Sequence, residues 1–144
     1  MEIGYWKEKM MGYRSDVAYT IRFVDDHDTN NEQSFYTFLL EAKANPKCQI
    51  ALAEVEVSAK KHTFTFNAES VKWYDNYPDV MSHMALVKQA EDWSCQVSEG
   101  KLHCKIGSMF VRIGEEANDI EERFNGDYDH DWMSVSRQII TDWS

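Results

Sequence analysis

The most restrictive feature of the sequence is a strict alternation of side chains over residues 13–24. Polar and small residues alternate there with four large apolar ones, which are Val17, Tyr19, Ile21 and Phe23. Successive side chains of an extended chain point to opposite faces, so this period of two predicts a strand with one buried face. The chain must therefore form a sheet, with other apolar elements packed against that face.

Two stretches predict the helices that cover such a sheet. The first follows a capping box at Thr29 and Glu32, ends near Pro46, and has apolar residues at helical spacing, namely Phe35, Phe38, Leu39 and Ala42. The second starts at Pro78, which suits the first turn of a helix, and carries on one face Val80, Met84 and Val87. We expect both helices to bury these stripes against the sheet.

The remaining apolar stretches predict further strands. Residues 48–57 and 62–68 alternate and are joined by a short turn, which predicts an antiparallel hairpin. Residues 92–108 fit either a small hairpin or a helix end, a loop and a strand that runs into residues 109–113. A short acidic helix or loop and a last strand at residues 133–140 complete the prediction.

This order of elements predicts an α+β fold of the ferredoxin-like type. Such a β-α-β-β-α-β sandwich has an antiparallel sheet with two helices on one face. The C-terminal acidic segment and its strand would add to an edge of this sheet. The length of 144 residues suits one domain, and we expect an N-terminal arm at residues 1–12 and a single α+β domain at residues 13–144.

Charge and cysteine content narrow the partners and the compartment. The formal net charge is −10, which disfavours direct binding of nucleic acid or of an anionic membrane, because both need Lys and Arg. The acidic balance either keeps the protein soluble or fits a basic surface of another protein. No stretch reaches the length of a transmembrane span, and three loosely spaced cysteines indicate free thiols in a reducing cytoplasm. A disulfide between Cys95 and Cys104 is the less favoured alternative.

The densest charge lies between residues 115 and 131. Eight carboxylates in this segment face a single cation, Arg123, and we expect them to form an acidic interaction surface, composed of Glu115, Glu116, Asp119, Glu121, Glu122, Asp127, Asp129 and Asp131. Arg112 and Arg137 flank the segment. We expect them to form ion pairs with Asp119 or Glu121 that fix the segment to the sheet, in preference to binding a substrate.

The sequence contains none of the common catalytic or cofactor motifs. Glycine-rich phosphate loops and the patterns C-x-x-C, H-E-x-x-H and G-x-S-x-G are absent, so we predict no catalytic residue, cofactor or metal ligand. Residues 127–131 resemble the start of a calcium loop. Such a loop needs Gly and Glu where this chain has Trp132 and Gln138. We therefore predict a binding protein in preference to an enzyme.

Four pieces of the sequence form a recognisable set. They are YRSDV at residues 13–17, VKWY and YPDV between residues 71 and 80, FVRIGEE and DIEE between residues 110 and 122, and VSR with Ile139 near the end. The set resembles a family of small uncharacterised proteins of tailed bacteriophages and prophages, and it covers residues 12–140. This family often has Asp or Tyr near Ala117 and Asn118, so the chain departs from the pattern there. The resemblance implies a viral protein that acts in the host bacterial cytoplasm, without a known activity.

The acidic surface and the viral resemblance together favour a phage-encoded accessory protein that binds a host protein with a basic surface. Such a protein could modulate or inhibit a defence or nucleic-acid-handling factor, for example by imitating the phosphates of nucleic acid. Trp73, Tyr74 and Tyr77 would form an aromatic anchor beside the carboxylates. The alternatives are a small-molecule or nucleotide binder, with or without hydrolytic activity, that uses Arg112 or Arg137, and a homo-oligomeric accessory such as a homodimer.

Overall fold

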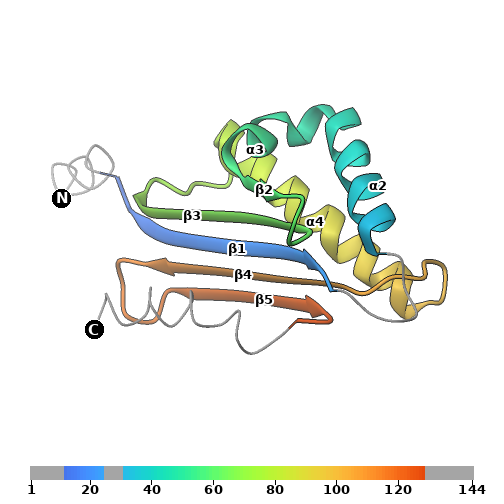
Figure 1. The fold of residues 1–144 in the computed structure, drawn as a ribbon. Helices are drawn as coiled ribbons and strands as arrows, with labels where there is room; N and C mark the ends of the chain where they lie inside the picture. The colour runs from blue at the N-terminus through green and yellow to red at the C-terminus, as the bar shows by residue number, and fades with distance from the viewer. Residues whose placement is uncertain (1–11, 25–30, 129–144) are drawn as a thin grey trace, which may run out of the picture.

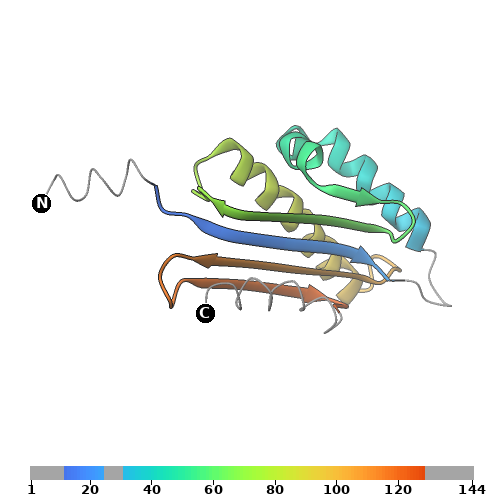
Figure 2. The same ribbon diagram turned by 60° about the vertical axis from the view of Figure 1, so that its left-hand side comes forward.

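The structure, a computed structural model, describes residues 12–24 and 31–128. Its antiparallel sheet has the strand order β2-β3-β1-β4-β5 (Figure 1) and is formed by β1 (Ser15–Phe23), β2 (Glu56–Ser58), β3 (Thr63–Val71), β4 (Ile106–Gly114) and β5 (Ile120–Gly126). In this part of the chain, the helices lie on one face of the sheet (Figures 1 and 2), and they are α2 (Asn31–Ala44), η1 (Pro46–Cys48), α3 (Gln49–Glu54) and α4 (Pro78–Ser98). The protein therefore has the α+β class predicted from the sequence.

β1 lies in the middle of the sheet, as its alternation requires. Val17, Tyr19, Ile21 and Phe23 are at most 3 % exposed and belong to the core between the sheet and the helices. Tyr19 has aromatic register partners on both neighbouring strands, which are Phe66 and Phe110. The predicted strand is confirmed for the residues of β1, but its second face is also buried at Asp16 and Ala18, which are 8 and 5 % exposed.

α2 and α4 supply the apolar cover of that face. The ring of Phe23 lies beside Phe38 of α2 and Trp93 of α4, with centroid distances of 5.5 and 5.8 Å. Phe35, Phe38 and Ala42 are fully buried on α2, and Leu39, the fourth residue of the predicted stripe, is partly buried against the core. Edge-to-face packing of this kind adds stabilisation beyond the apolar area that is buried.

The strand predicted at residues 48–57 is wrong for most of its length. Pro46 starts the turn η1, in which the Asn45 side chain accepts the N–H of Lys47, and the chain continues into α3. Cys48, Ala51 and Val55 are buried at spacings of three and four residues, which is the period of a helix. The alanines of this stretch also alternate with the period of a strand, which led to the wrong prediction. Alanine itself favours the helix. The hairpin with β3 survives only through the short β2.

Residues 92–108 follow the second of the two predicted alternatives. α4 continues to Ser98, and the chain turns at Gly100, which has a φ of 77°, before β4 begins at Ile106. A hairpin at this position is excluded because Cys95 lies within the helix. The three cysteines are free, with Cys48 and Cys104 buried and Cys95 exposed.

The acidic segment also differs from its prediction. Its second half is neither helix nor loop but the strand β5, which pairs with β4 from Ile113 opposite Ile120 to Gly107 opposite Gly126. Ile120, Glu122 and Phe124 share the face away from the helices, where Phe124 packs against apolar residues of β1 and β4. The strand predicted at residues 133–140 and the arm at residues 1–11 lie outside the described residues.

The sheet has a second, smaller apolar cluster on the face away from the helices. Ala18, Val111 and Ile113 are at most 5 % exposed there, and Phe124 packs against them. Asp127 and Tyr128, which follow β5, lie so close to this face that a side chain at Gly107 would collide with their backbone. Both faces of the central strands are therefore buried, which explains why β4 is apolar at almost every position.

Candidate functional site

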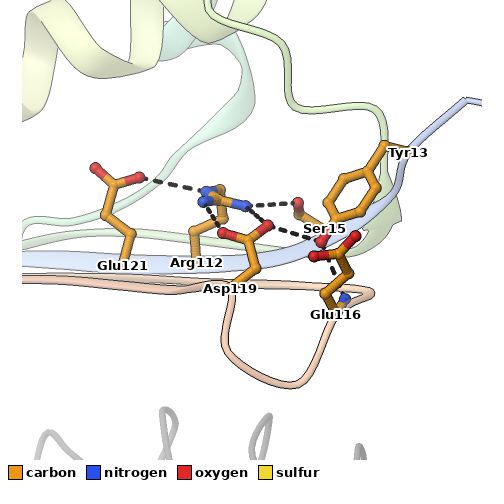
Figure 3. A network of polar contacts seen from close by, with 6 residues as sticks. All are labelled: Tyr13, Ser15, Arg112, Glu116, Asp119 and Glu121. Carbon is orange, nitrogen blue, oxygen red and sulfur yellow. Dashed lines mark hydrogen bonds and ion pairs between the residues drawn. The ribbon is translucent and has the colours of Figure 1, made fainter.

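Arg112 organises a polar network at the end of the sheet where β4 meets β5 (Figure 3). Its guanidinium donates to both oxygens of Asp119, at 3.0 and 2.6 Å, and to Glu121 at 3.3 Å. A fourth hydrogen bond links Arg112 to the hydroxyl of Ser15 at 3.1 Å. We expected Arg112 to pair with Asp119 or Glu121, and it contacts both. Arg137 lies outside the described residues.

Tyr13 joins this network to the loop that precedes α4. Its O–H donates to Asp119 at 2.7 Å, and its oxygen accepts the N–H of Glu116 at 3.0 Å. Its backbone N–H donates to the hydroxyl of Tyr74 at 2.5 Å. Gly114 makes this approach possible, because a side chain there would collide with both Tyr13 and Asp119. Tyr13, which precedes β1, therefore holds together the loop before α4 and the turn between β4 and β5, although the two are far apart in sequence.

The electrostatics of the network favour its ionised form. Hydrogen bonds from Arg112, and then from Tyr13, lower the pKa of Asp119 from 3.8 to about 2. The same contact with Asp119 raises the pKa of Arg112. Burial raises the pKa of Tyr13, which keeps its hydroxyl protonated as a donor. Asp119 is thus a fixed charge of the structure and does not serve as a proton donor near neutral pH.

The turn between β4 and β5 carries two carboxylates that do not bind Arg112 and that are exposed to solvent. Glu115 is exposed and accepts the backbone N–H of Arg14 at 2.9 Å. Glu116 is exposed as well, and its backbone amide is held by Tyr13. We call the group formed by this turn and the neighbouring aromatic residues the acidic corner, which consists of Tyr13, Tyr74, Tyr77, Glu115, Glu116 and Asp119.

The eight predicted carboxylates do not form one face. Glu121 lies on the helix side of the sheet with Arg112, whereas the alternation of β5 turns Glu122 to the opposite side. Asp127 lies beyond the other end of β5. Asp129 and Asp131 lie outside the described residues. The acidic segment becomes a strand, so its charges are divided between two faces and two ends.

The three predicted aromatic residues have different roles. Trp73 is half-buried and packs against the core, with its ring centroid 6.1 Å from Phe66 and 6.4 Å from Phe110. Tyr74 and Tyr77 form an edge-to-face pair at 5.0 Å next to Tyr13. The pair therefore belongs to the acidic corner, whereas Trp73 belongs to the core.

A hydrogen-bonded chain under the helices was missed by the sequence analysis. The fully buried His83 is 2.6 Å from the hydroxyl of Tyr19 and 2.7 Å from the carboxylate of Glu54. Burial lowers the pKa of His83, while Glu54 opposes this shift. The neutral ring fits both contacts if Nδ1 accepts from Tyr19 and Nε2 donates to Glu54. No sequence signal connects these three residues, because they come from separate elements.

A half-open groove of about 900 Å³ lies between η1, α4 and β5. Its apolar lining includes Trp73, Met81 and Met84. Its charged lining combines the cations Lys47, Lys88 and Arg123 with the carboxylates Asp75 and Glu121. Met81 is 57 % exposed. Such a mixture of apolar walls and a few polar groups is typical of ligand sites.

The described residues contain no group of three or more His, Cys, Asp or Glu side chains arranged to hold a metal ion. Among the same residues, every helix is too short or too polar to cross a membrane. No protein-family model, curated protein or solved structure matches the chain. The function is therefore inferred from the geometry of the acidic corner and the groove.

Proposed function

We propose that the protein binds a basic surface of another protein through its acidic corner. The observation that carries this proposal is that one carboxylate of the turn between β4 and β5 is held inside the structure while two others are exposed. Arg112 and Tyr13 fix Asp119, and this leaves Glu115 and Glu116 exposed on a turn held at both ends. A turn whose backbone is fixed in advance loses little freedom on binding, and its exposed charges attract a basic partner.

The tyrosine pair supports the same proposal. Tyr74 and Tyr77 are half-buried, are packed against each other, and are attached to the acidic turn through Tyr13. Tyrosine supplies a large contact area with few rotatable bonds, and it is enriched among the residues that dominate binding energy. A partner with Arg or Lys beside an apolar patch would fit such a corner.

We also propose that the protein is an accessory protein of a tailed phage that acts on a host factor in the bacterial cytoplasm. Three of the four pieces that carry the family resemblance contribute residues to the acidic corner or its support, namely Tyr13, Tyr74 and Arg112. A basic groove that normally holds nucleic acid is the partner surface that Glu115 and Glu116 would imitate. Inhibition of a host defence or nucleic-acid-handling factor is the expected outcome.

The same proposal includes the finer fold assignment. We infer that β1, α2, β2, β3, α4 and β4 form a ferredoxin-like unit, to which β5 is added. The support is the order of these elements in the chain and the sheet order β2-β3-β1-β4. In this arrangement the acidic corner is built where the added strand leaves the unit.

The test compares capture of host proteins by wild-type protein and by E115Q/E116Q. We expect the double variant to lose the captured partner, and we expect wild-type capture to weaken as salt is raised. E32Q/E56Q is the matched control, because it removes the same charge at exposed positions on α2 and β2. Equal loss with both variants, or capture that is insensitive to salt, would contradict the proposal.

The groove beside α4 favours a second candidate, a binder of small anionic molecules such as nucleotides. Trp73 would stack on a base while Lys47 and Lys88 hold phosphate. A ligand that binds only the folded state raises the melting temperature. We expect nucleotides to raise the melting temperature of the wild type and to have no effect on M81E, which introduces a negative charge into the groove. The absence of any shift would leave the groove without this role.

A further inference from the structure

β5 forms the longer free edge of the described sheet. The strand order ends at the seven-residue β5 on one side and at the three-residue β2 on the other (Figures 1 and 2). An edge strand has unpaired N–H and C=O groups, which can pair with a strand of another chain. β5 contains neither Pro nor Lys, the two residues that most often prevent such pairing.

Two hydrogen bonds identify the residues of β5 whose backbone groups point outward. Gly114 N–H donates to the carbonyl of Asp119, and Asp127 N–H donates to the carbonyl of Ile106. In the register of β4 and β5, residues that exchange hydrogen bonds alternate with residues that do not. The odd-numbered residues of β5 therefore bond to β4, and the free edge carries the N–H and C=O groups of Ile120, Glu122 and Phe124.

We propose that β5 pairs with the same strand of a second copy of this chain, antiparallel, around a two-fold axis at Glu122. This pairing joins the two sheets into one. It places Glu121 opposite Arg123 of the partner subunit and Ile120 opposite Phe124 of the partner subunit, and symmetry repeats both pairs. A two-fold interface needs a surface that complements itself, and this strand has one.

Charge selects this register over its neighbours. An axis moved to Arg123 would set two arginines opposite each other, and an axis moved to Glu121 would set two glutamates opposite each other. The axis at Glu122 also opposes two glutamates, but it brings Glu121 opposite Arg123 of the partner subunit twice. With the axis at Glu122, the opposed Glu121 and Arg123 occupy positions without ladder hydrogen bonds, where the backbones are only about 4.5 Å apart. Opposite charges at such positions stabilise strand pairing.

The side chains of these residues have capacity left for a partner. Arg123 uses Nε and Nη2 to bind Glu91, and Glu121 uses Oε1 to bind Arg112. Within the described residues this leaves Nη1 of Arg123 and Oε2 of Glu121, on side chains that are 36 % and 42 % exposed. Ile120 is 46 % exposed, so its side chain is available for an apolar pair across the axis.

The proposed register has one unfavourable contact, and this contact supplies the test. Glu122 meets its own symmetry mate at the axis, so E122Q removes a repulsion and should strengthen the dimer. E122P removes the N–H that bonds across the axis, but it costs no hydrogen bond to β4. I120E replaces an exposed apolar contact with a charge and provides a second disruptive variant.

The experiment is sedimentation velocity on the full chain over about a hundredfold range of concentration. We expect the wild type to dimerise reversibly, E122Q to dimerise roughly three- to fivefold more tightly, and E122P and I120E to remain monomeric. Circular dichroism establishes that each variant is folded, and I120E decides the result if E122P is not.

Two outcomes would overturn the proposal. Wild type and E122Q that stay monomeric at every concentration would exclude the interface, and a dimer unchanged in E122P or I120E would place it elsewhere. The proposed partner binding is tested separately, because E115Q/E116Q leaves the β5 edge intact. Monomeric variants that still capture a basic partner would separate the two functions.

Discussion

Arg112 and Arg123 lie on neighbouring strands and face the same side of the sheet, but they bind carboxylates of different origin. Arg112 binds Asp119 and Glu121, seven and nine residues away within its own hairpin. Arg123 binds Glu91 of α4, 32 residues away, beside Asn125. The first arginine holds a turn in place and thereby shapes a surface, whereas the second attaches an edge strand to a helix.

This difference predicts that Arg112 is the more important of the two for stability. R112M leaves Asp119 and Glu121 without a cation in a site where the arginine is only 18 % exposed, so we expect a loss of about 2–3 kcal/mol. Urea denaturation measures the change. R14M is the control, since Arg14 is exposed and binds one backbone carbonyl. Equal losses in both variants would show that the network adds nothing specific.

R123M should destabilise the protein by a smaller amount, about 1–1.5 kcal/mol, since the arginine is 36 % exposed and Glu91 retains Asn125. Hydrogen exchange should show the loss of protection in β5 and little change in the turn at residues 115–119. The matched control is K88M, which removes an exposed pair with Asp92. A loss larger than that of R112M would reverse the ranking of the two arginines.

The lowered pKa of Asp119 gives the comparison a pH dependence. Its folded pKa of about 2 lies below the ordinary 3.8, so the pair contributes stability above pH 3.8 and loses this contribution as the pH falls toward 2. After allowance for solvent exposure, the contribution is about 1 kcal/mol. The stability difference between wild type and D119N should therefore shrink across this range. A constant difference would mean that Asp119 is not the titrating group.

Y13F should have the smallest effect, about 0.5–1 kcal/mol, because it removes one hydroxyl that serves Asp119 and the amide of Glu116. Its effect should be confined to the acidic corner. Amide exchange at Glu116 should accelerate while β5 remains protected. Y36F is the control, because Tyr36 is 43 % exposed on α2. Faster exchange throughout β5 would show that Tyr13 supports the whole strand.

The two arginines also show how much the sequence can reveal. The contacts of Arg112 are local in a hairpin, so charge order along the chain was enough to propose them. The contact between Arg123 and Glu91 depends on how α4 crosses the sheet, and no sequence pattern encodes it. The α+β class followed from period-two and helical spacing, which report burial directly.

The errors of the sequence analysis have physical causes of the same kind. In residues 48–57 the small alanines fit both a helix and a strand, and Pro46 decided the outcome by starting a helical turn. Around residues 120–126 the charges concealed a strand, because β5 lies at an edge and its polar residues remain partly exposed. Residue composition therefore gave a wrong secondary structure in segments that pack against the rest of the protein on only one side.

The distribution of thiols offers a practical route to watching the acidic corner. Cys95 is the exposed cysteine, and it lies on α4 about 25 Å along the helix axis from the Tyr77 end. A maleimide dye would therefore attach there without touching Glu115 or Glu116. Energy transfer from this dye to a labelled partner would report in real time whether the corner is occupied. The helix holds the dye at a fixed distance from the corner.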